Sequence, residues 1–178
     1  MPAPAFKTLR RFGRSNSGAT AVEFAMVALP LIALILASLQ TAIIFFFDEA
    51  LQTATEQSAR QLMTGSAQLS DTTQTQFANV VCANAPAPFQ CSNIMVDVQS
   101  ASSFSSINTS PLTLTYDVHG NVTNTWSYSP GNPGDIVIVR VMYNWPVFGG
   151  PLAFGLANQP NGNHLLVATA VFKNEPYQ

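Results

Sequence analysis

The hydrophobic positions of the chain gather in one long run near its beginning. Residues 24–47 read FAMVALPLIALILASLQTAIIFFF and include no charged side chain. At 1.5 Å per residue such a helix would span about 36 Å, against about 30 Å for the hydrocarbon core of a bilayer. Apolar side chains occur all around this helix, as contact with lipid requires. The run therefore predicts a transmembrane helix, in which Pro30 removes one backbone donor.

The helical pattern continues beyond the apolar run. In 48–64 the positions that share one face are small or apolar, namely Leu51, Ala54, Thr55, Ser58 and Leu62. Glu56 and Arg60 are spaced four apart, which suits an ion pair on another face. Gly65 is a suitable C-cap. Together the segments predict one helix of about 40 residues, about 60 Å long, which packs against a sheet or another helix.

Later segments predict a short helix and a small loop. Ser70-Asp71 suits the N-cap of a second helix over 72–83. Cys82 and Cys91 flank a proline-containing stretch, so they form a small disulfide loop or remain two free thiols. On the oxidising side of a membrane the disulfide would persist.

The second half of the chain reads as strands. Four segments are rich in β-branched and aromatic residues: Ile94–Val98, Leu112–Val118, Ile136–Tyr143 and Leu165–Phe172. SPGNPGD at 129–135 is a turn or short loop, and 144–155 is a longer connection. The expected fold class is α+β, with a single N-terminal transmembrane helix that continues as a long helix and is followed by a small antiparallel sheet domain.

Composition and charge exclude several classes of protein. Charged residues make up 9% of the chain, against roughly 25% in soluble proteins, which argues against an ordinary cytosolic globule. The 47% of hydrophobic residues, with 12 Phe, argues against a disordered chain. The overall balance is −2, so a strongly basic nucleic-acid binder is excluded and no nucleic-acid partner is expected.

The distribution of charge predicts how the span is oriented. Four basic residues precede it and serve as the topology signal: Lys7, Arg10, Arg11 and Arg14. Asp48 and Glu49 follow it directly. By the positive-inside rule the N-terminus lies in the cytoplasm and residues 48–178 lie outside. Phe45-Phe46-Phe47 then suits an anchor at the outer interface, which makes membrane lipid an expected partner.

Two kinds of export signal are alternatives to a retained span. Arg10-Arg11 followed by Phe12 suggests a twin-arginine signal, and a Sec signal would be cut near Ala37-Ser38-Leu39. The apolar run is long for either, because a signal-peptide core usually has about 7–15 residues. No small-residue cleavage motif ends the run clearly.

Glu23 is an unusual residue because it lies at the start of the apolar run. A carboxylate at the middle of a membrane helix costs about 2.5–3.5 kcal/mol, and less near the interface. Such a residue suggests a function, although a hydrated position among the lipid headgroups would also explain it. The preceding order is a basic leader, Gly18, four small or aliphatic residues, Glu23 and then Phe24.

This order resembles the processing site of the type IV pilin superfamily. More narrowly, ATAVEFAMVALPLIALIL at 19–36 resembles the start of TadE-like minor pilins of tight-adherence (Flp-type) pilus systems. The resemblance implies that a prepilin peptidase cuts between Gly18 and Ala19 and that the span is retained. It also implies that Glu23, next to Phe24, registers one subunit against another. A TadF-like minor pilin is a close alternative.

The spacing gives this implied cleavage a chemical consequence. The cut would create a positive amino terminus at Ala19, four residues before Glu23 and on the same helix face. The carboxylate would then pair with this amine or with that of a neighbouring subunit. In a low dielectric such a pair offsets the burial cost, whereas either charge alone is expensive.

The resulting organisation is a basic leader at 1–18, a transmembrane helix at 19–47, a helical extension at 48–66 and an outer α+β domain at 67–178. The resemblance implies a pilin-like fold and a single-pass protein of the bacterial inner membrane with a periplasmic C-terminal domain. This protein would serve pilus assembly either from the membrane or as part of the surface pilus. Expected partners are the prepilin peptidase, other pilins and the inner-membrane assembly platform. The alternative function is a membrane-anchored periplasmic envelope or binding protein with an uncleaved signal anchor.

No motif of an enzyme is present. The chain contains no G-x-S-x-G, H-E-x-x-H or phosphate-binding glycine motif. His119 and His164 are far from the cysteines in sequence, and Asp97, Asp117 and Asp135 are isolated at strand positions or turns. We therefore expect no catalysis, no metal site and no cofactor.

Overall fold

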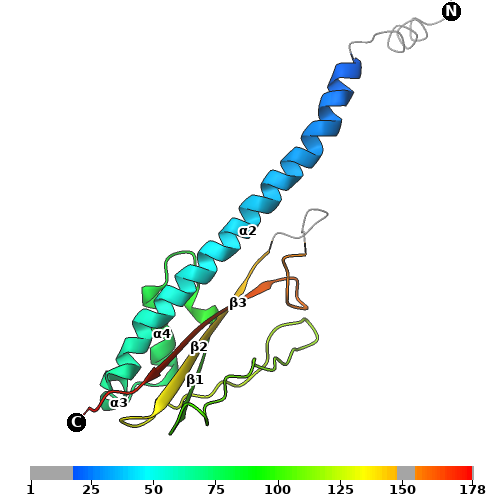
Figure 1. Cartoon of the computed structure of the whole chain (residues 1–178). Coiled ribbons are helices and arrows are strands. Elements are labelled where there is room, and N and C mark those ends of the chain that lie inside the picture. Colours follow the sequence, from blue (N-terminus) through cyan, green and yellow to red (C-terminus); the bar gives the residue numbers. More distant parts are fainter. Residues whose placement is uncertain (1–17, 148–154, 178) are drawn as a thin grey trace, which may run out of the picture. The chain divides into compact units, whose positions relative to one another are not determined.

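The computed structural model describes residues 18–147 and 155–177 and confirms the expected fold class (Figure 1). The described residues fall into two compact units, which divide between Gln40 and Thr41. The helices are α2 (Ala19–Met63), α3 (Ser66–Leu69), α4 (Gln74–Asn84) and a short 3-10 helix, η2 (Cys91–Asn93). The strands are β1 (Ile94–Ala101), β2 (Ile136–Trp145) and β3 (His164–Lys173). A long apolar helix is thus followed by a small antiparallel sheet.

The C-terminal half of α2 belongs to the second unit and supplies one side of its core. The predicted buried face is confirmed, since Leu51, Ala54, Thr55, Ser58 and Leu62 are all fully buried. The two hydroxyls are satisfied within the helix: Thr55 donates to the Leu51 carbonyl at 2.8 Å and Ser58 to the Ala54 carbonyl at 2.7 Å. These bonds let small polar side chains lie in an apolar core.

The end of α2 agrees with the predicted cap, but one expected ion pair is absent. The helix ends at Met63, and Gly65 adopts a left-handed conformation with φ of 77°. The prediction that Glu56 pairs with Arg60 is wrong, because Arg140–Asp97 is the only ion pair among residues 18–147 and 155–177. Glu56 instead accepts a hydrogen bond from the Gln52 amide at 2.7 Å.

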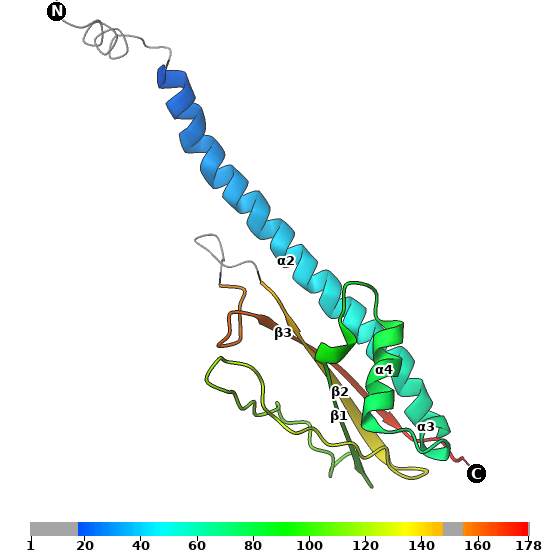
Figure 2. The same ribbon diagram turned by 180° about the vertical axis from the view of Figure 1, so that it is seen from behind.

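The three strands form a sheet in the order β1-β2-β3, with both neighbouring pairs antiparallel. The central strand β2 is buried over most of its length because both faces of the sheet are covered. On one face Val98, Val139 and Ala170 are in register, and the core on this face includes side chains from α2 and α4. Figure 2 shows α4 beside the C-terminal half of α2 on this side of the sheet.

The opposite face of the sheet is covered by the long connection between β1 and β2. Ile107 from this connection forms a second small core with Ile136 and Ile138. Leu112 and Leu114 border an apolar groove over the same face, together with Val167 and Val171 of β3. The sheet therefore separates a helical layer from a layer of irregular chain (Figures 1 and 2).

The strand predicted at Leu112–Val118 is not formed. Its only bridge joins Tyr116 to Val122, and its backbone pairs locally, as when the Thr123 amide donates to the Thr115 carbonyl at 2.9 Å. Both outer edges of the sheet are already contacted by other groups. Next to β1, the Val98 amide donates to the Ser127 carbonyl at 2.8 Å. Leu112 and Leu114 are half-buried over the sheet face, whereas Tyr116 and Val118 are exposed, so the alternation along 112–118 does not reflect membership of the sheet.

The outer edge of β3 is contacted by a side chain of α2. The Gln52 amide nitrogen donates to the Thr169 carbonyl at 3.1 Å, and the Gln52 amide oxygen accepts from the Thr169 amide at 3.0 Å. A primary amide used in this way reproduces both hydrogen bonds of a neighbouring peptide group. Gln52 thus occupies the position that a further strand would use at Thr169.

The second helix begins later than expected. α4 starts at Gln74 and is capped by Thr73, whose side chain accepts from the Gln76 amide while the Gln76 side chain accepts from the Thr73 amide. The prediction of a cap at Ser70-Asp71 is wrong because Ser70 is the C-cap of α3, and its side chain donates to the Ser66 carbonyl at 2.7 Å. The capping box at Thr73 satisfies two donors reciprocally, which explains why it prevails.

Candidate functional site

The first candidate site is the beginning of α2. Gly18 is exposed, and apart from its own chain neighbours and the local helix backbone no heavy atom of the described residues lies within 4 Å of the position that a Cβ would take. α2 begins at the next residue, Ala19. The bond expected to be cut therefore lies at the helix boundary, beside an open glycine. The basic residues of the topology signal lie outside the described residues: Lys7, Arg10, Arg11 and Arg14.

Glu23 is the fifth residue of α2 and carries an exposed side chain. Phe24 beside it is 75% exposed. Glu23 forms no ion pair with any residue that the structure describes, since the one ion pair there joins Arg140 and Asp97. The helical spacing of Ala19 and Glu23 by four residues puts both on one face. A positive group at the start of this helix would thus lie on the same face as the carboxylate.

The N-terminal part of α2 presents apolar side chains to its surroundings. Large hydrophobic residues are exposed on all sides of it, including Val22, Met26, Val27, Leu29, Leu31, Ile32, Leu34 and Ile35. In the described part of the chain, α2 is the one helix long and apolar enough to cross a membrane, and its most apolar window contains no buried residue. These features are consistent with single-pass anchoring in a membrane.

A second feature is the loop that joins α4 to the sheet. Cys82 and Cys91 form a disulfide with Cα atoms 5.3 Å apart, and no other cysteine is present in the chain. Cys82 is buried at the end of α4, whereas Cys91 is exposed at the start of η2. The bond therefore fastens the loop 83–90 at both ends.

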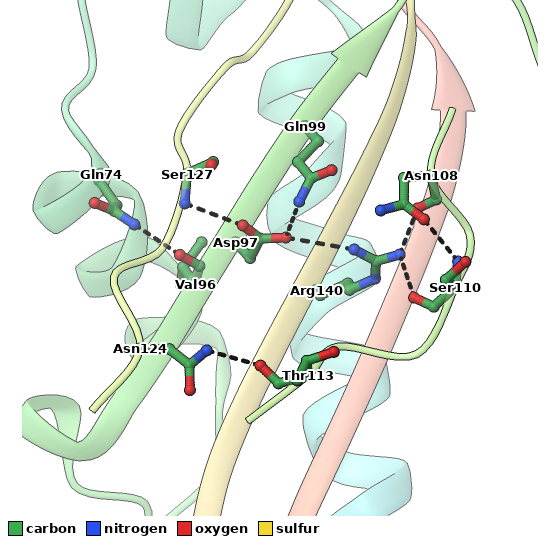
Figure 3. A network of polar contacts seen from close by, with 10 residues as sticks. All are labelled: Gln74, Val96, Asp97, Gln99, Asn108, Ser110, Thr113, Asn124, Ser127 and Arg140. Atoms are coloured by element: carbon green, nitrogen blue, oxygen red, sulfur yellow. Dashed lines mark hydrogen bonds and ion pairs between the residues drawn. The ribbon is translucent and has the colours of Figure 1, made fainter. Parts of the chain in front are cut away.

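A polar network of the second unit surrounds Asp97 and Arg140 (Figure 3). Asp97 is 2% exposed and Arg140 is 5% exposed, and their closest charged atoms are 3.5 Å apart. The Asp97 carboxylate also accepts from the Gln99 amide at 2.8 Å and from the Ser127 backbone amide at 3.0 Å. The expectation that Asp97 is isolated is therefore wrong.

Arg140 uses its second terminal nitrogen to hold the long connection between β1 and β2. This nitrogen donates to the Asn108 carbonyl at 2.5 Å and to the Ser110 carbonyl at 3.2 Å (Figure 3). Because Asp97 holds Ser127, the pair fastens both halves of the connection to the sheet. The sequence does carry one signal for this role, an arginine within the alternating apolar segment of β2, but its partners follow only from the fold.

The described residues do not bring together a set of catalytic groups. Among residues 18–147 and 155–177, no group of three or more His, Cys, Asp or Glu side chains could hold a metal ion. His119 lies at an exposed turn, and the His164 ring contacts the Leu156 carbonyl. The pKa of Asp117 is lowered by hydrogen bonds from Asn121, first from its backbone and then from its side chain. Burial raises the pKa of the Tyr128 hydroxyl.

Comparison with known proteins gives one result. Residues 18–60 match the family described as TadE-like protein. No curated protein and no solved structure matches the chain. The match begins at Gly18 and ends within α2, so it covers the helix and leaves the sheet outside. The resemblance expected from the motif around Gly18 and Glu23 is thus confirmed for this segment, and the match supports a protein associated with tight-adherence pili.

Proposed function

We propose that this chain is a minor pilin or pseudopilin, similar to TadE, that is cut after Gly18 by a prepilin peptidase and is needed to assemble Flp-type adhesive pili. The observation that carries the proposal is the family match, which begins at the residue expected to precede the cut. The start of α2 at Ala19 supports it, since the new N-terminus would open the helix directly.

The role proposed for Glu23 follows from its place on α2. After cleavage the amine of Ala19 is one helical turn from the carboxylate. In lipid, an unpaired charge of either sign costs free energy. Pairing the Ala19 amine with the Glu23 carboxylate, within one copy or between two copies, lowers this cost. Pairing between copies would set the axial register of neighbouring helices.

The proposed topology divides the tasks between the two units. The apolar part of α2 anchors the protein in the bacterial inner membrane, with the leader in the cytoplasm and the sheet domain in the periplasm. The leader is the substrate of the peptidase, and the chain itself performs no catalysis. Other pilins and the assembly platform are the proposed partners of the mature protein.

Mass spectrometry of the membrane form, prepared with and without the cognate peptidase, tests the cleavage. A mature chain that begins at Ala19 supports the proposal. Gly18→Leu should leave the leader attached, because a branched side chain would stand beside the scissile bond. A chain that starts at Met1 in the presence of the peptidase, or near residue 40, would contradict the proposal and favour an uncleaved anchor or an export signal.

The pairing role is tested separately with Glu23→Ala. This variant should still be cut but should lose assembled pili, measured as pili recovered by shearing. Glu49→Ala is the matched control, because Glu49 is an exposed glutamate of the same helix beyond the apolar run. Normal piliation of Glu23→Ala would remove the pairing role, and it is the outcome that an uncleaved envelope anchor predicts.

A further inference from the structure

A cluster of aromatic rings lies in the second unit where the apolar run of α2 ends. Phe47 stacks on Trp145 with ring centroids 4.1 Å apart. Phe89 contacts Phe47 edge-on at 5.6 Å and lies 6.0 Å from Trp145. These rings come from α2, from the loop after α4 and from the end of β2, segments far apart in the sequence.

Tyr143 of β2 and the disulfide of the loop 83–90 hold this cluster in place. Tyr143 is 4% exposed and contacts Phe89 edge-on at 4.9 Å, and its hydroxyl accepts a hydrogen bond from the Gln90 amide at 3.3 Å. The Cys82–Cys91 disulfide fastens the loop that carries Phe89. Figures 1 and 2 both show this loop beside α2. The rings are therefore held in a defined arrangement.

Two further rings next to this cluster are open to the surroundings. Phe45 is 68% exposed and Phe46 is 63% exposed, and Phe46 contacts Phe47 with centroids 5.2 Å apart. We call Phe45, Phe46, Phe47, Phe89 and Trp145 the aromatic cluster. Exposed neighbouring phenylalanines on a folded domain are costly in water, which indicates that another apolar phase covers them.

The position of the aromatic cluster along α2 identifies that phase. A hydrocarbon core about 30 Å thick takes about 20 residues of helix, and the headgroup regions add about 5–8 Å on each side. The apolar run from Phe24 therefore leaves the core near Phe45, and the first charges follow at Asp48 and Glu49. Aromatic rings are enriched at this level of membrane proteins.

We propose that the aromatic cluster rests in the outer headgroup region of the membrane, so that the folded domain itself contacts lipid through Phe89 and Trp145. The inference rests on the membrane anchoring proposed above but not on cleavage or pilus assembly. The contact sets how deeply α2 enters the bilayer, because the loop of Phe89 and the end of β2 cannot follow the helix into the core.

The test measures the emission of single tryptophans in the full chain, reconstituted in phosphatidylcholine vesicles with or without bromine on the upper acyl chain. Trp126→Phe leaves Trp145 as the only tryptophan, and Trp145→Phe leaves Trp126. Trp126 lies beside Val96, because the Gln74 side chain donates to the carbonyls of both residues. Val96 pairs with Val141, which lies four residues before Trp145, or about 13 Å along β2. Trp126 is therefore farther than Trp145 from the expected membrane surface. Brominated lipid should remove most of the Trp145 emission and little of the Trp126 emission.

A matched pair of variants tests the exposed rings. Phe45→Ser combined with Phe46→Ser should weaken the quenching of Trp145, because the domain loses its apolar contact with the interface. Phe104→Ser should leave the quenching unchanged, since Phe104 is 66% exposed but lies in the connection between β1 and β2. All these side chains are exposed, so the variants are expected to fold.

The outcomes separate this inference from the proposed function. If Trp145 is quenched no more than Trp126, the aromatic cluster faces water or protein and the inference is overturned. Mass spectrometry on the same samples reports the leader. A chain cut after Gly18 with unquenched Trp145 overturns only the lipid contact. An uncut chain with quenched Trp145, prepared with the peptidase, overturns only the proposed processing.

Discussion

At the residue scale, the buried pair of Arg140 and Asp97 holds the connection between β1 and β2 against the sheet. Two charges taken out of water cost several kcal/mol each, and their attraction repays this only when the remaining polar atoms are satisfied. Here three further kinds of partner satisfy them: the Gln99 amide, the Ser127 amide and two backbone carbonyls. The pair therefore links two halves of one connection through the sheet.

Replacing Arg140 by methionine should be strongly destabilising. The change leaves Asp97 charged and buried without its cation and frees the carbonyls of Asn108 and Ser110. Removing one partner of a buried pair costs about 3–5 kcal/mol. Urea unfolding of the detergent-solubilised chain in a Trp145→Phe background, followed by the fluorescence of Trp126 next to Ser127, measures this loss of free energy.

Arg60→Met is the control for this experiment, because Arg60 is exposed and forms no ion pair within the described ranges. Its effect should stay within about 0.5 kcal/mol. Equal effects of the two substitutions would show that the buried pair carries no special share of the stability.

The turn around Asp117 should respond to acid in a defined direction. Its carboxylate accepts from the Asn121 backbone amide at 2.8 Å, from the Asn121 side-chain amide at 3.0 Å and from the His119 backbone amide at 2.8 Å, and these hydrogen bonds lower the pKa of Asp117 below the ordinary 3.8. A lowered carboxyl pKa means that the turn is fully stabilised above the ordinary value and loses this contribution as the pH falls through the lowered one.

Titration of the Gly120 and Asn121 amide shifts by NMR tests this direction, with Asp117→Asn as the control that should abolish the transition. A midpoint above 3.8 would contradict the proposed hydrogen bonding.

At the scale of elements, the end of α2 depends on one glycine. Gly65 has φ of 77°, and a Cβ there would collide with the ring of Tyr177. A non-glycine residue in the left-handed region costs about 1–2 kcal/mol, and the forced repacking of a ring adds about 1–3 kcal/mol. Gly65→Ala should lower the free energy of unfolding by the sum of these two effects.

Gly134→Ala separates the two contributions. Gly134 has φ of 86°, but nothing lies within 4 Å of its Cβ position. This variant should therefore show the conformational cost alone. If urea unfolding gives both variants the same free energy, the contact between Tyr177 and the end of α2 does not restrict that site.

Elements were predictable from sequence where their cause is local. The apolar run, the buried face at Leu51 and Leu62 and the glycine after α2 all follow from spacing within a single helix. The segment Leu112–Val118 alternates like a strand, yet pairing depends on whether a sheet edge is free, which its own residues do not reveal. The Arg140–Asp97 pair joins positions 43 residues apart and required the strand register.

The candidate sites follow the same division. The motif around Gly18 and Glu23 is continuous in sequence, so the residues alone suggested the family that residues 18–60 match. The aromatic cluster joins Phe47 of α2, Phe89 of the loop after α4 and Trp145 of β2. Only Phe45, Phe46 and Phe47 could be assigned to an interface beforehand, because they are consecutive.

At the scale of the molecule, the second unit should fold without the first. Its main core extends from Ile44 to Phe172 and includes residues of α2, α4 and all three strands. A fragment of residues 41–178 in mild detergent should therefore show the same urea midpoint as the full chain, measured by tryptophan fluorescence. A fragment that lacks cooperative unfolding would show that the apolar part of α2 contributes to the stability of this core.

The disulfide supplies the comparison for this fragment. Closing a loop of this length stabilises by roughly 2–3 kcal/mol through the unfolded state. The fragment with Cys82→Ser and Cys91→Ser should lose about that much, and a larger loss would indicate that the bond also keeps Phe89 against Phe47.

The amide of Gln52 on the rim of β3 has a consequence for crowding. In a protein with a small open sheet, a free edge strand can pair with the edge strand of another copy, and repeated pairing leads to fibres. The side-chain amide of Gln52 already bonds the backbone N–H and C=O of Thr169, so these groups cannot pair with a strand of another copy. Thr169 is thereby unavailable as a template on which strands of further copies could stack.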